Sequence, residues 1–273
     1  MPYRRRPRQF TPYSLGRQLR YLMSRAVGTR LQKSQQLRFV DFQGHRYKRI
    51  MLRDSYLASL IEHALESFGP TPHLPPLAAR YEHEIWTEFI PGRPLQPQRD
   101  ADIAALVTCF ATLYCRAPQT VALAETPFPY RLWSDLRFLH RTGLISASQH
   151  DGLSELADAW APWEVWLGFD YTDPVIKNFI IRDDDRRACA VDVESLEPQT
   201  LLGWGIAKAK ARWLGEDTSG FLDRLAAQGS PDVRAYFRYV ELCFLARWTK
   251  TGFLEQKWRY VQPERLTRLL TQP

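Results

Sequence analysis

The sequence predicts an α+β protein in which a small antiparallel β lobe with one helix precedes a larger, mainly helical lobe. Residues 37–52 form two runs of strand-forming residues around a turn at Gln43-Gly44-His45, as expected for a β-hairpin. Residues 55–68 then place apolar side chains at helical spacing and stop before a glycine. Segments with helical spacing dominate from residue 101 onward.

We expect three parts along the chain: a basic N-terminal arm with an amphipathic helix at 1–29, the small lobe at 30–91 and the large lobe at 92–273. An apolar strand that ends at Pro91-Gly92 marks the change from one lobe to the next. In the large lobe, the spacing of apolar residues predicts helices at 101–116, 131–142, 146–160, 203–214, 218–228, 231–248 and 262–271.

The composition indicates a globular protein, because 45% of the 273 residues are apolar and 13% are aromatic. No stretch approaches eighteen uninterrupted apolar residues, and the N-terminus lacks the apolar core of a secretory signal. We therefore expect a cytoplasmic protein. The four cysteines show no paired spacing, so we expect buried, reduced thiols and no structural metal.

The net charge of +7 is concentrated at one end of the chain. The first 40 residues contain ten Lys or Arg and no Asp or Glu. Residues 14–27 form an amphipathic helical pattern, which fits either a helix docked on the domain or an anchor on an anionic membrane surface at the inner face of the membrane. Nucleic-acid binding is disfavoured, because no RNA-binding motif accompanies this basic arm.

The most informative stretch carries three oxygen-bearing side chains, Asp173, Asn178 and Asp192. Two apolar runs around a charged turn separate Asn178 from Asp192, so a hairpin would bring all three side chains to one end. Mg²⁺ prefers carboxylate and amide oxygens together with substrate phosphates. The remaining aspartate could then accept a proton from an attacking hydroxyl.

This pattern resembles the catalytic loop of the protein-kinase-like superfamily, and most closely that of aminoglycoside phosphotransferases and choline-kinase-like small-molecule kinases. Their loop reads roughly His-Gly-Asp with an Asn five residues after the Asp, and Tyr171 here replaces the histidine. Their second motif, Ile-Asp-aromatic-Glu, corresponds to Val191-Asp192-Val193-Glu194. The resemblance implies a two-lobed kinase-like fold that uses ATP and Mg²⁺, with Asp173 as the catalytic base and Asn178 and Asp192 as metal ligands.

A second run, Glu88-Phe89-Ile90-Pro91-Gly92, is similar to the lobe connection of the same kinases. The resemblance implies that the backbone of Glu88, Phe89 and Ile90 meets the adenine. It also implies that a lysine of the small lobe contacts the phosphates and pairs with a glutamate of the following helix, for which Lys48 and Glu62 are the candidates. Arg49 and Glu66 are the alternatives, because a slip of one residue reverses which strand side chains face inward.

The function that follows is ATP- and Mg²⁺-dependent phosphorylation of a hydroxyl on a small molecule or glycan. A second interpretation is a lipopolysaccharide or lipid-linked sugar kinase, held at the membrane face by residues 14–27. A third is a pseudokinase that binds without phosphoryl transfer, which is favoured by Tyr171 and by the absence of a glycine-rich loop before Leu37. Protein substrates are disfavoured, because no Ala-Pro-Glu element follows Asp192.

Overall fold

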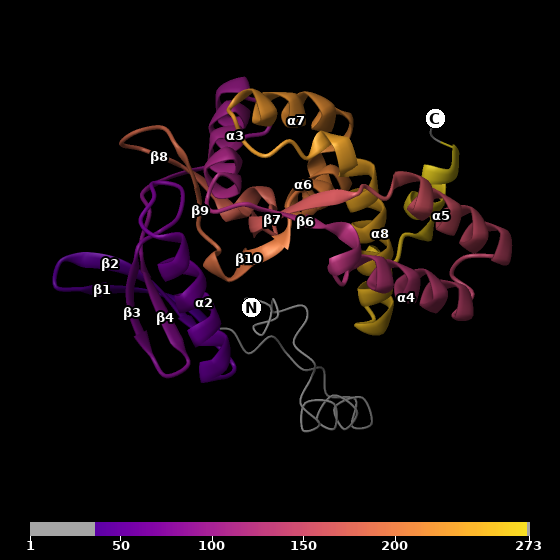
Figure 1. Cartoon of the computed structure of the whole chain (residues 1–273). Helices are drawn as coiled ribbons and strands as arrows, with labels where there is room; N and C mark the ends of the chain where they lie inside the picture. The colour runs from indigo at the N-terminus through magenta and orange to yellow at the C-terminus, as the bar shows by residue number, and fades with distance from the viewer. Residues whose placement is uncertain (1–35, 272–273) are drawn as a thin grey trace. The chain divides into compact units, whose positions relative to one another are not determined.

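The structure is a computed structural model that describes residues 36–271, so the predicted helix at 14–27 lies outside the described residues. The chain divides into two compact units (Figure 1). The first comprises the residues up to Cys109 together with Ile176–Gln199, and the second comprises Phe110–Val175 and the residues from Thr200 onward. The lobe boundaries expected from the sequence remain predictions.

The first unit contains a four-stranded antiparallel sheet in the order β1-β2-β4-β3. Its strands are β1 (Gln36–Phe42), β2 (His45–Met51), β3 (Leu77–Tyr81) and β4 (Glu84–Glu88). The predicted β1–β2 hairpin is confirmed: Gln43 and Gly44 have φ values of 51° and 79°. Two consecutive residues with positive φ form the turn whose twist matches that of paired strands, and glycine adopts this backbone without strain.

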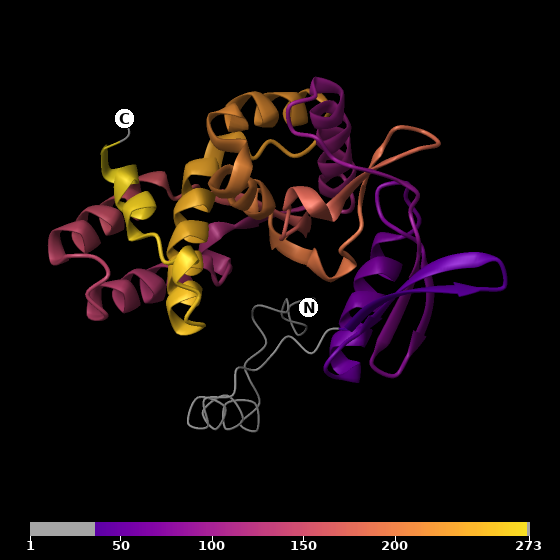
Figure 2. The ribbon, with the colours of Figure 1, turned by 180° about the vertical axis from the view of Figure 1, so that it is seen from behind.

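One helix, α2 (Ser55–Phe68), lies along this sheet and packs on β3 and β4 (Figure 2). Asp54 caps its N-terminus by accepting a hydrogen bond from the backbone N–H of Leu57. The apolar face of the helix is buried through Ala58, Ile61, Ala64, Leu65 and Phe68. The predicted order of a β-hairpin followed by one helix is therefore confirmed.

A second, three-stranded sheet in the first unit has the order β5-β8-β9. It consists of β5 (Gly92–Pro94), β8 (Phe179–Arg182) and β9 (Ala188–Ala190), so the hairpin predicted after Asn178 is confirmed. Gly92 is required where β5 meets β8, because a Cβ atom at this position would lie 2.3 Å from the carbonyl oxygen of Ile181.

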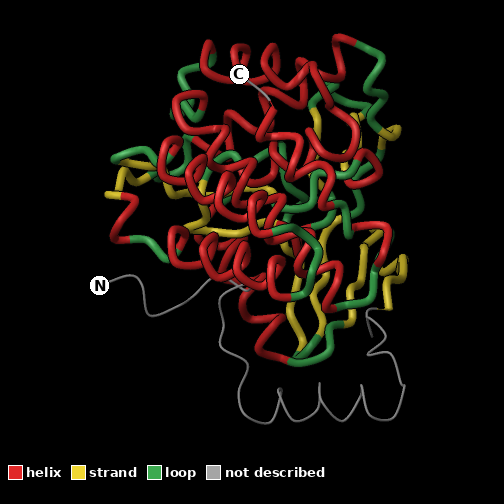
Figure 3. The backbone as a smooth tube through the Cα atoms, turned by 90° about the vertical axis from the view of Figure 1, so that its right-hand side faces the viewer, coloured by secondary structure: helices red, strands yellow, loops and turns green. Residues whose placement is uncertain are grey.

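The second unit is mostly helical (Figure 3). Its sheet joins β6 (Gln119–Ala122), β7 (Glu164–Tyr171) and β10 (Leu196–Leu201), of which the last two residues belong to this unit. Helix α8 packs against α4 and α6, and α4 packs against α5. The helices that the structure describes after α2 are α3 (Asp100–Tyr114), α4 (Phe128–Arg141), α5 (Ala147–Trp160), α6 (Trp204–Ala209), α7 (Thr218–Ala227), α8 (Phe237–Leu254) and α9 (Pro263–Arg268).

Three details differ from the expectations drawn from the sequence. The helix predicted at 203–214 changes at Lys210 from α6 into a π-helix, Lys210–Leu214. Cys115 is exposed, whereas Cys109, Cys189 and Cys243 are buried as predicted. The sequence does not predict the strands β3, β5, β6, β7 and β10. Across residues 36–271, no helix is long and apolar enough to cross a membrane.

Candidate functional site

In the first unit, the β8–β9 hairpin brings Asn178 and Asp192 together. Phe179 pairs with Ala190, and the backbone N–H of Val191 donates to the carbonyl of Asn178 at 2.9 Å. The side-chain amide of Asn178 then lies 3.4 Å from Oδ2 of Asp192. The two predicted metal ligands thus lie side by side at the end of the ladder, Asn178 one residue and Asp192 two residues beyond the last strand pair.

Lys48 joins this pair from β2. Its Nζ donates to the carbonyl of Val191 at 2.7 Å and lies 3.9 Å from Oδ1 of Asp192. The side chain is buried, and burial lowers the pKa of Lys48, while the nearby Asp192 and Glu194 carboxylates oppose that shift. A lysine of β2 and two oxygen-bearing side chains at the end of the β8–β9 hairpin therefore form one polar cluster.

Strand register distinguishes Lys48 from Arg49. Lys48 is paired with Thr87 and lies on the buried face of β2, whereas Arg49 is paired with Trp86 on the opposite face. The Arg49 guanidinium lies over the Trp86 ring and forms an ion pair with Glu84. Arg49 is thus directed away from the Asn178 and Asp192 cluster.

Glu62 and Glu66 are placed differently from what the resemblance implies. The Glu62 carboxylate forms a 2.6 Å ion pair with Arg80 of β3, and Glu66 is exposed on α2. Lys48 pairs with Asp192 instead of with either glutamate. In this structure the lysine is therefore held by the hairpin of the predicted metal ligands.

The run of Glu88, Phe89 and Ile90 follows β4. The backbone N–H of Glu88 donates to the carbonyl of Pro76, and that of Phe89 donates to the carbonyl of Arg46, each at 3.0 Å. Both N–H groups are thus already hydrogen-bonded. An adenine base that accepts a hydrogen bond from this run would therefore accept it from the backbone at Ile90 or beyond.

In the second unit, Asp173 follows β7 and forms an ion pair with Lys208 of α6, whose Nζ lies 2.6 Å from Oδ1. The neighbouring carbonyl of Pro174 accepts a hydrogen bond from the Trp213 indole at 2.8 Å. Asp173 stays partly exposed, with 37% of its side-chain surface accessible, so a ligand can reach the carboxylate. Tyr171, which replaces the histidine of the resembling motif, is fully buried.

A buried aspartate that the sequence reasoning missed anchors this loop. Asp170 accepts hydrogen bonds from the hydroxyl of Tyr114, the backbone N–H of Tyr171 and the backbone N–H of Gly205, at 2.7–3.1 Å. Burial, reinforced by the Asp170 charge, raises the pKa of Tyr114. The only signal in the sequence was an acidic residue at the end of an apolar run, Leu167 to Phe169.

Gly205 allows the α6 helix to approach that anchor. A Cβ atom on Gly205 would lie 2.2 Å from the carbonyl oxygen of Tyr171 and 2.8 Å from Asp170 Oδ1. No side chain larger than hydrogen fits without displacing the helix or the strand. The position of Lys208, one turn further along α6, therefore depends on this glycine.

The donor set of Asn178 and Asp192 fits a hard cation. Mg²⁺ is commonly held by one or two carboxylates together with substrate phosphates, and these two side chains offer an amide and a carboxylate within hydrogen-bonding reach of each other. Over the described part of the chain, no group of three or more His, Cys, Asp or Glu residues could hold a metal ion by itself. A cation at this site would thus need oxygens from a ligand.

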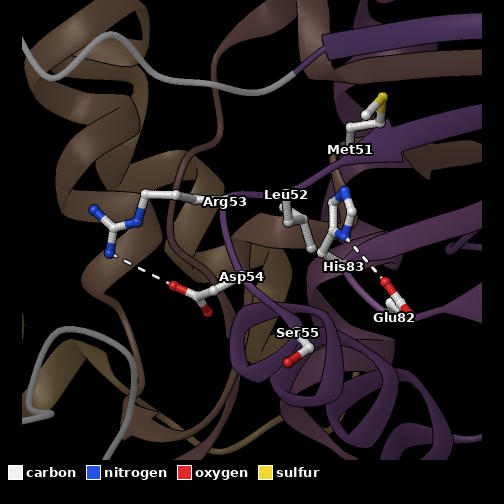
Figure 4. Close-up of a pocket in the computed structure, with 7 residues that line it drawn as sticks. All are labelled: Met51, Leu52, Arg53, Asp54, Ser55, Glu82 and His83. Atoms are coloured by element: carbon white, nitrogen blue, oxygen red, sulfur yellow. Dashed lines mark ion pairs between the residues drawn. The ribbon is translucent and has the colours of Figure 1, made fainter.

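A separate open pocket lies at the start of α2 and contains none of the predicted site residues (Figure 4). It is lined by Met51, Leu52, Arg53, Asp54, Ser55, Glu82 and His83. Both carboxylates of the pocket already have partners. Asp54 caps the helix and forms a 3.6 Å ion pair with Arg53. Glu82 lies 3.9 Å from the ring of His83. We assign no role to this pocket.

Comparison with known proteins identifies the fold. No family model matches the chain, and no curated protein gives a significant sequence match. A search of solved structures finds the choline kinase LicA from Streptococcus pneumoniae with a TM-score of 0.62 and 12% identity, covering 93% of this chain and 99% of that one. Macrolide 2'-phosphotransferase type I matches with a TM-score of 0.59 and 13% identity, covering 96% of this chain and 99% of that one.

A thermostable mutant of aminoglycoside phosphotransferase APH(4)-Ia also matches, with a TM-score of 0.56, 13% identity and coverage of 92% of this chain and 98% of that one. The chain therefore has the fold of the protein-kinase-like superfamily, as the sequence predicted. Within that class, its structural neighbours here are small-molecule kinases and phosphotransferases. At such low identities the likeness establishes the fold and leaves the activity to be argued from the site.

Proposed function

We propose that this protein is an ATP- and Mg²⁺-dependent phosphotransferase that acts on a hydroxyl group of a small molecule or glycan. The observation that carries the proposal is the cluster of Lys48, Asn178 and Asp192 at the end of the β8–β9 hairpin. The ammonium group of Lys48 suits the phosphates of a nucleotide, and the Asn178 amide and the Asp192 carboxylate suit the metal ion bound to those phosphates.

The roles proposed for the residues follow from their chemistry. Asn178 and Asp192 would hold Mg²⁺, which when bound neutralises charge on the phosphates of the nucleotide. Lys48 would contact phosphate oxygens through its ammonium group. Asp173 would orient the acceptor hydroxyl and receive its proton as the hydroxyl oxygen bonds to the γ-phosphorus and the bond to the leaving ADP breaks.

Two neighbours support a nucleotide as one ligand. One solved structure is LicA in complex with AMP, and another is a ternary complex of the APH(4)-Ia mutant with ADP and hygromycin B. Both have the same fold as this chain, with TM-scores of 0.56 and 0.53. In the proposal, Glu88, Phe89 and Ile90 lie next to the base, and Glu62 supports the small lobe through Arg80.

A pseudokinase is the second candidate, and one observation favours it. The carboxylate proposed as the base is already paired with Lys208 at 2.6 Å, so an acceptor hydroxyl has to share or displace that contact. A lipid-linked sugar or lipopolysaccharide acceptor remains the alternative that depends on residues 14–27, which lie outside the described residues.

Incubation of the pure protein with γ-labelled ATP, Mg²⁺ and a bacterial metabolite and envelope extract tests the proposal. We expect label in an extracted compound with the wild type and none with Asp173→Asn. Asp184→Asn is the matched control, because Asp184 lies in the exposed hairpin turn, where it pairs with Arg182 and accepts a hydrogen bond from the backbone N–H of Asp185. Nucleotide binding without transfer to any extracted compound would favour the pseudokinase.

A further inference from the structure

One face of the helical segment after Gly203 holds the loop that carries Asp173. Lys208 contacts Asp173, and Trp213, five residues further on, donates to the next residue of the loop, Pro174. Lys208 lies in α6, and the π-helix Lys210–Leu214 continues it; residues four positions apart on a helix lie on one side of it. Arg212 therefore belongs to the side of the segment that meets the loop.

Arg212 shares an aromatic ring with a second arginine. The Cζ atoms of Arg212 and Arg259 lie 5.5 and 4.7 Å from the centre of the Tyr260 ring. That ring packs against Trp248 at 5.3 Å between centroids. Gly252 of α8 permits the approach, because a Cβ there would lie 2.9 Å from the Cβ of Tyr260. Both guanidinium groups therefore contact the same ring, which packing against Trp248 holds in place.

The charge on this side of the second unit is basic. From Trp204 to Leu214 the chain carries Lys208, Lys210 and Arg212 and no acidic residue. Lys208 is paired with Asp173, and Lys210 is paired with Glu241 at 2.7 Å. Within residues 36–271, neither Arg212 nor Arg259 forms an ion pair with a carboxylate.

We propose that the hydroxyl compound phosphorylated by this protein carries a phosphate or carboxylate group, and that Arg212 and Arg259 bind this group beside Asp173. The proposal rests on the proposed function, because it names the second ligand of the same reaction. Guanidinium groups bind the oxygens of phosphate and carboxylate through paired N–H donors. An acceptor held in this way presents its hydroxyl to the Asp173 carboxylate.

The same charges disfavour a cationic acceptor. Choline and aminoglycosides carry positive charge, and on this side of the unit they would meet two arginines that lack a carboxylate partner. Like charges brought together lower affinity and prevent binding of the wrong ligand. The acceptor class of this protein therefore differs from that of a choline kinase, although the two share a fold.

Calorimetric titration of the full-length protein, saturated with Mg²⁺ and a non-hydrolysable ATP analogue, tests the proposal. The probes are glycerol 3-phosphate and gluconate as anions, glycerol as a neutral compound and choline as a cation. The variants are Arg212→Gln, Arg259→Gln and, as a matched control, Arg137→Gln, which removes a guanidinium that lies 4.9 Å from the centre of the Trp133 ring on α4. A melting temperature for each variant shows whether it folds.

We expect at least one anion to bind more tightly than glycerol and choline, and the phosphate and carboxylate probes show which group is preferred. Loss of one guanidinium contact should weaken that binding about tenfold in Arg212→Gln or in Arg259→Gln, with no change in Arg137→Gln. Anions that bind no better than choline, or that bind equally to wild type and both folded variants, would overturn the inference. A parallel assay with Mg-ATP in place of the analogue separates the inference from the proposed function. Transfer of phosphate to choline would overturn the inference and leave the proposed function intact, whereas anion binding that is lost in the variants, with no transfer to any compound, would overturn the proposed function and leave Arg212 and Arg259 as an anion-binding site.

Discussion

Asn178 and Asp192 are fourteen residues apart in the sequence, yet their side chains lie 3.4 Å apart. The antiparallel register of β8 and β9 produces this contact, because Phe179 faces Ala190 and the hairpin folds the chain back on itself. Lys48 reaches the same place from β2. The proposed phosphate site is therefore specified by strand pairing, and each contributing strand can be tested separately.

Replacing Asp192 should affect nucleotide binding, whereas replacing Asp173 should affect turnover. Asp192→Ala should abolish Mg²⁺-dependent nucleotide binding, because it removes a proposed ligand of the metal. Asp173→Ala should leave binding nearly intact and reduce turnover by about 10²–10⁴-fold, since a general base acts mainly in the transition state. Calorimetric titration with Mg-ATP and a steady-state phosphate-transfer assay measure the two quantities. Equal loss of nucleotide affinity in both variants would contradict these roles.

Lys48 and Arg49 provide a matched pair on opposite faces of one strand. Lys48→Met should weaken Mg-ATP binding by roughly tenfold or more, because a charge-assisted contact to phosphate is lost. Arg49→Met should leave the affinity unchanged, since Arg49 pairs with Glu84 away from the cluster. Both dissociation constants are measured by titration at one pH. A larger effect of Arg49→Met would show that the strand register of the site is wrong.

Much of this site follows from local sequence patterns, and the rest does not. The sequence predicts the strand pair around Gly44 and the hairpin after Asn178, because strand-forming residues and turn residues are recognisable within a few neighbouring positions. The choice between Lys48 and Arg49 depends on pairing with β4, some forty positions away, and two adjacent basic residues carry no local signal about which one is buried. Register, a non-local property, decides it.

The second unit shows the same limit more strongly. Strand β6 has only four residues, and β7 is an almost continuously buried run that periodicity cannot separate from a buried helix. Asp170 is recognisable as an anchor only once Tyr114 and Gly205, which lie far from it in the sequence, are placed around it. Glu62 was assigned by resemblance, and its partner Arg80 lies on β3, a strand that the sequence did not predict.

The ion pair between Arg93 and Asp102 should stabilise the first unit. Two hydrogen bonds of 2.6 Å join the side chains, and Asp102 also accepts from the backbone N–H of Gln96. Because Asp102 is buried, Asp102→Asn should lower the free energy of unfolding by about 2–3 kcal/mol at pH 7. Asp232→Asn breaks an exposed pair with Arg234 and should cost less than about 1 kcal/mol. Urea denaturation gives both values.

The ion pair between Arg93 and Asp102 should also make the free energy of unfolding depend on pH. The hydrogen bonds from Arg93 lower the pKa of Asp102 below its ordinary value of 3.8. Its stabilising contribution is therefore complete above about pH 4 and is lost as the pH falls through the lower pKa of the folded state. Wild type should lose more unfolding free energy than Asp102→Asn between pH 5 and pH 3, whereas parallel curves for the two proteins would contradict the assignment.

Two helical glycines in the second unit should respond oppositely to alanine. Gly205→Ala places a Cβ 2.2 Å from the carbonyl of Tyr171, so we expect a loss of about 2–3 kcal/mol and lower turnover, because α6 also carries Lys208. Gly220→Ala on α7 meets no atom within 4 Å and should stabilise by up to about 1 kcal/mol. Thermal unfolding of the two variants compares them, and a Gly205→Ala protein as stable as wild type would show that α6 and β7 are not packed as described.

The most direct test of the proposed site is the melting temperature of the wild-type protein with Mg-ATP, with ATP plus a chelator, and without ligand. We expect a rise with Mg-ATP that corresponds to about 2.7 kcal/mol at a hundred times the dissociation constant. We expect a much smaller rise when the metal is removed, because Asn178 and Asp192 are proposed to contact the nucleotide through the cation. No shift at millimolar Mg-ATP, or an equal shift in the presence of the chelator, would contradict the assignment of Lys48, Asn178 and Asp192 as a magnesium-nucleotide site.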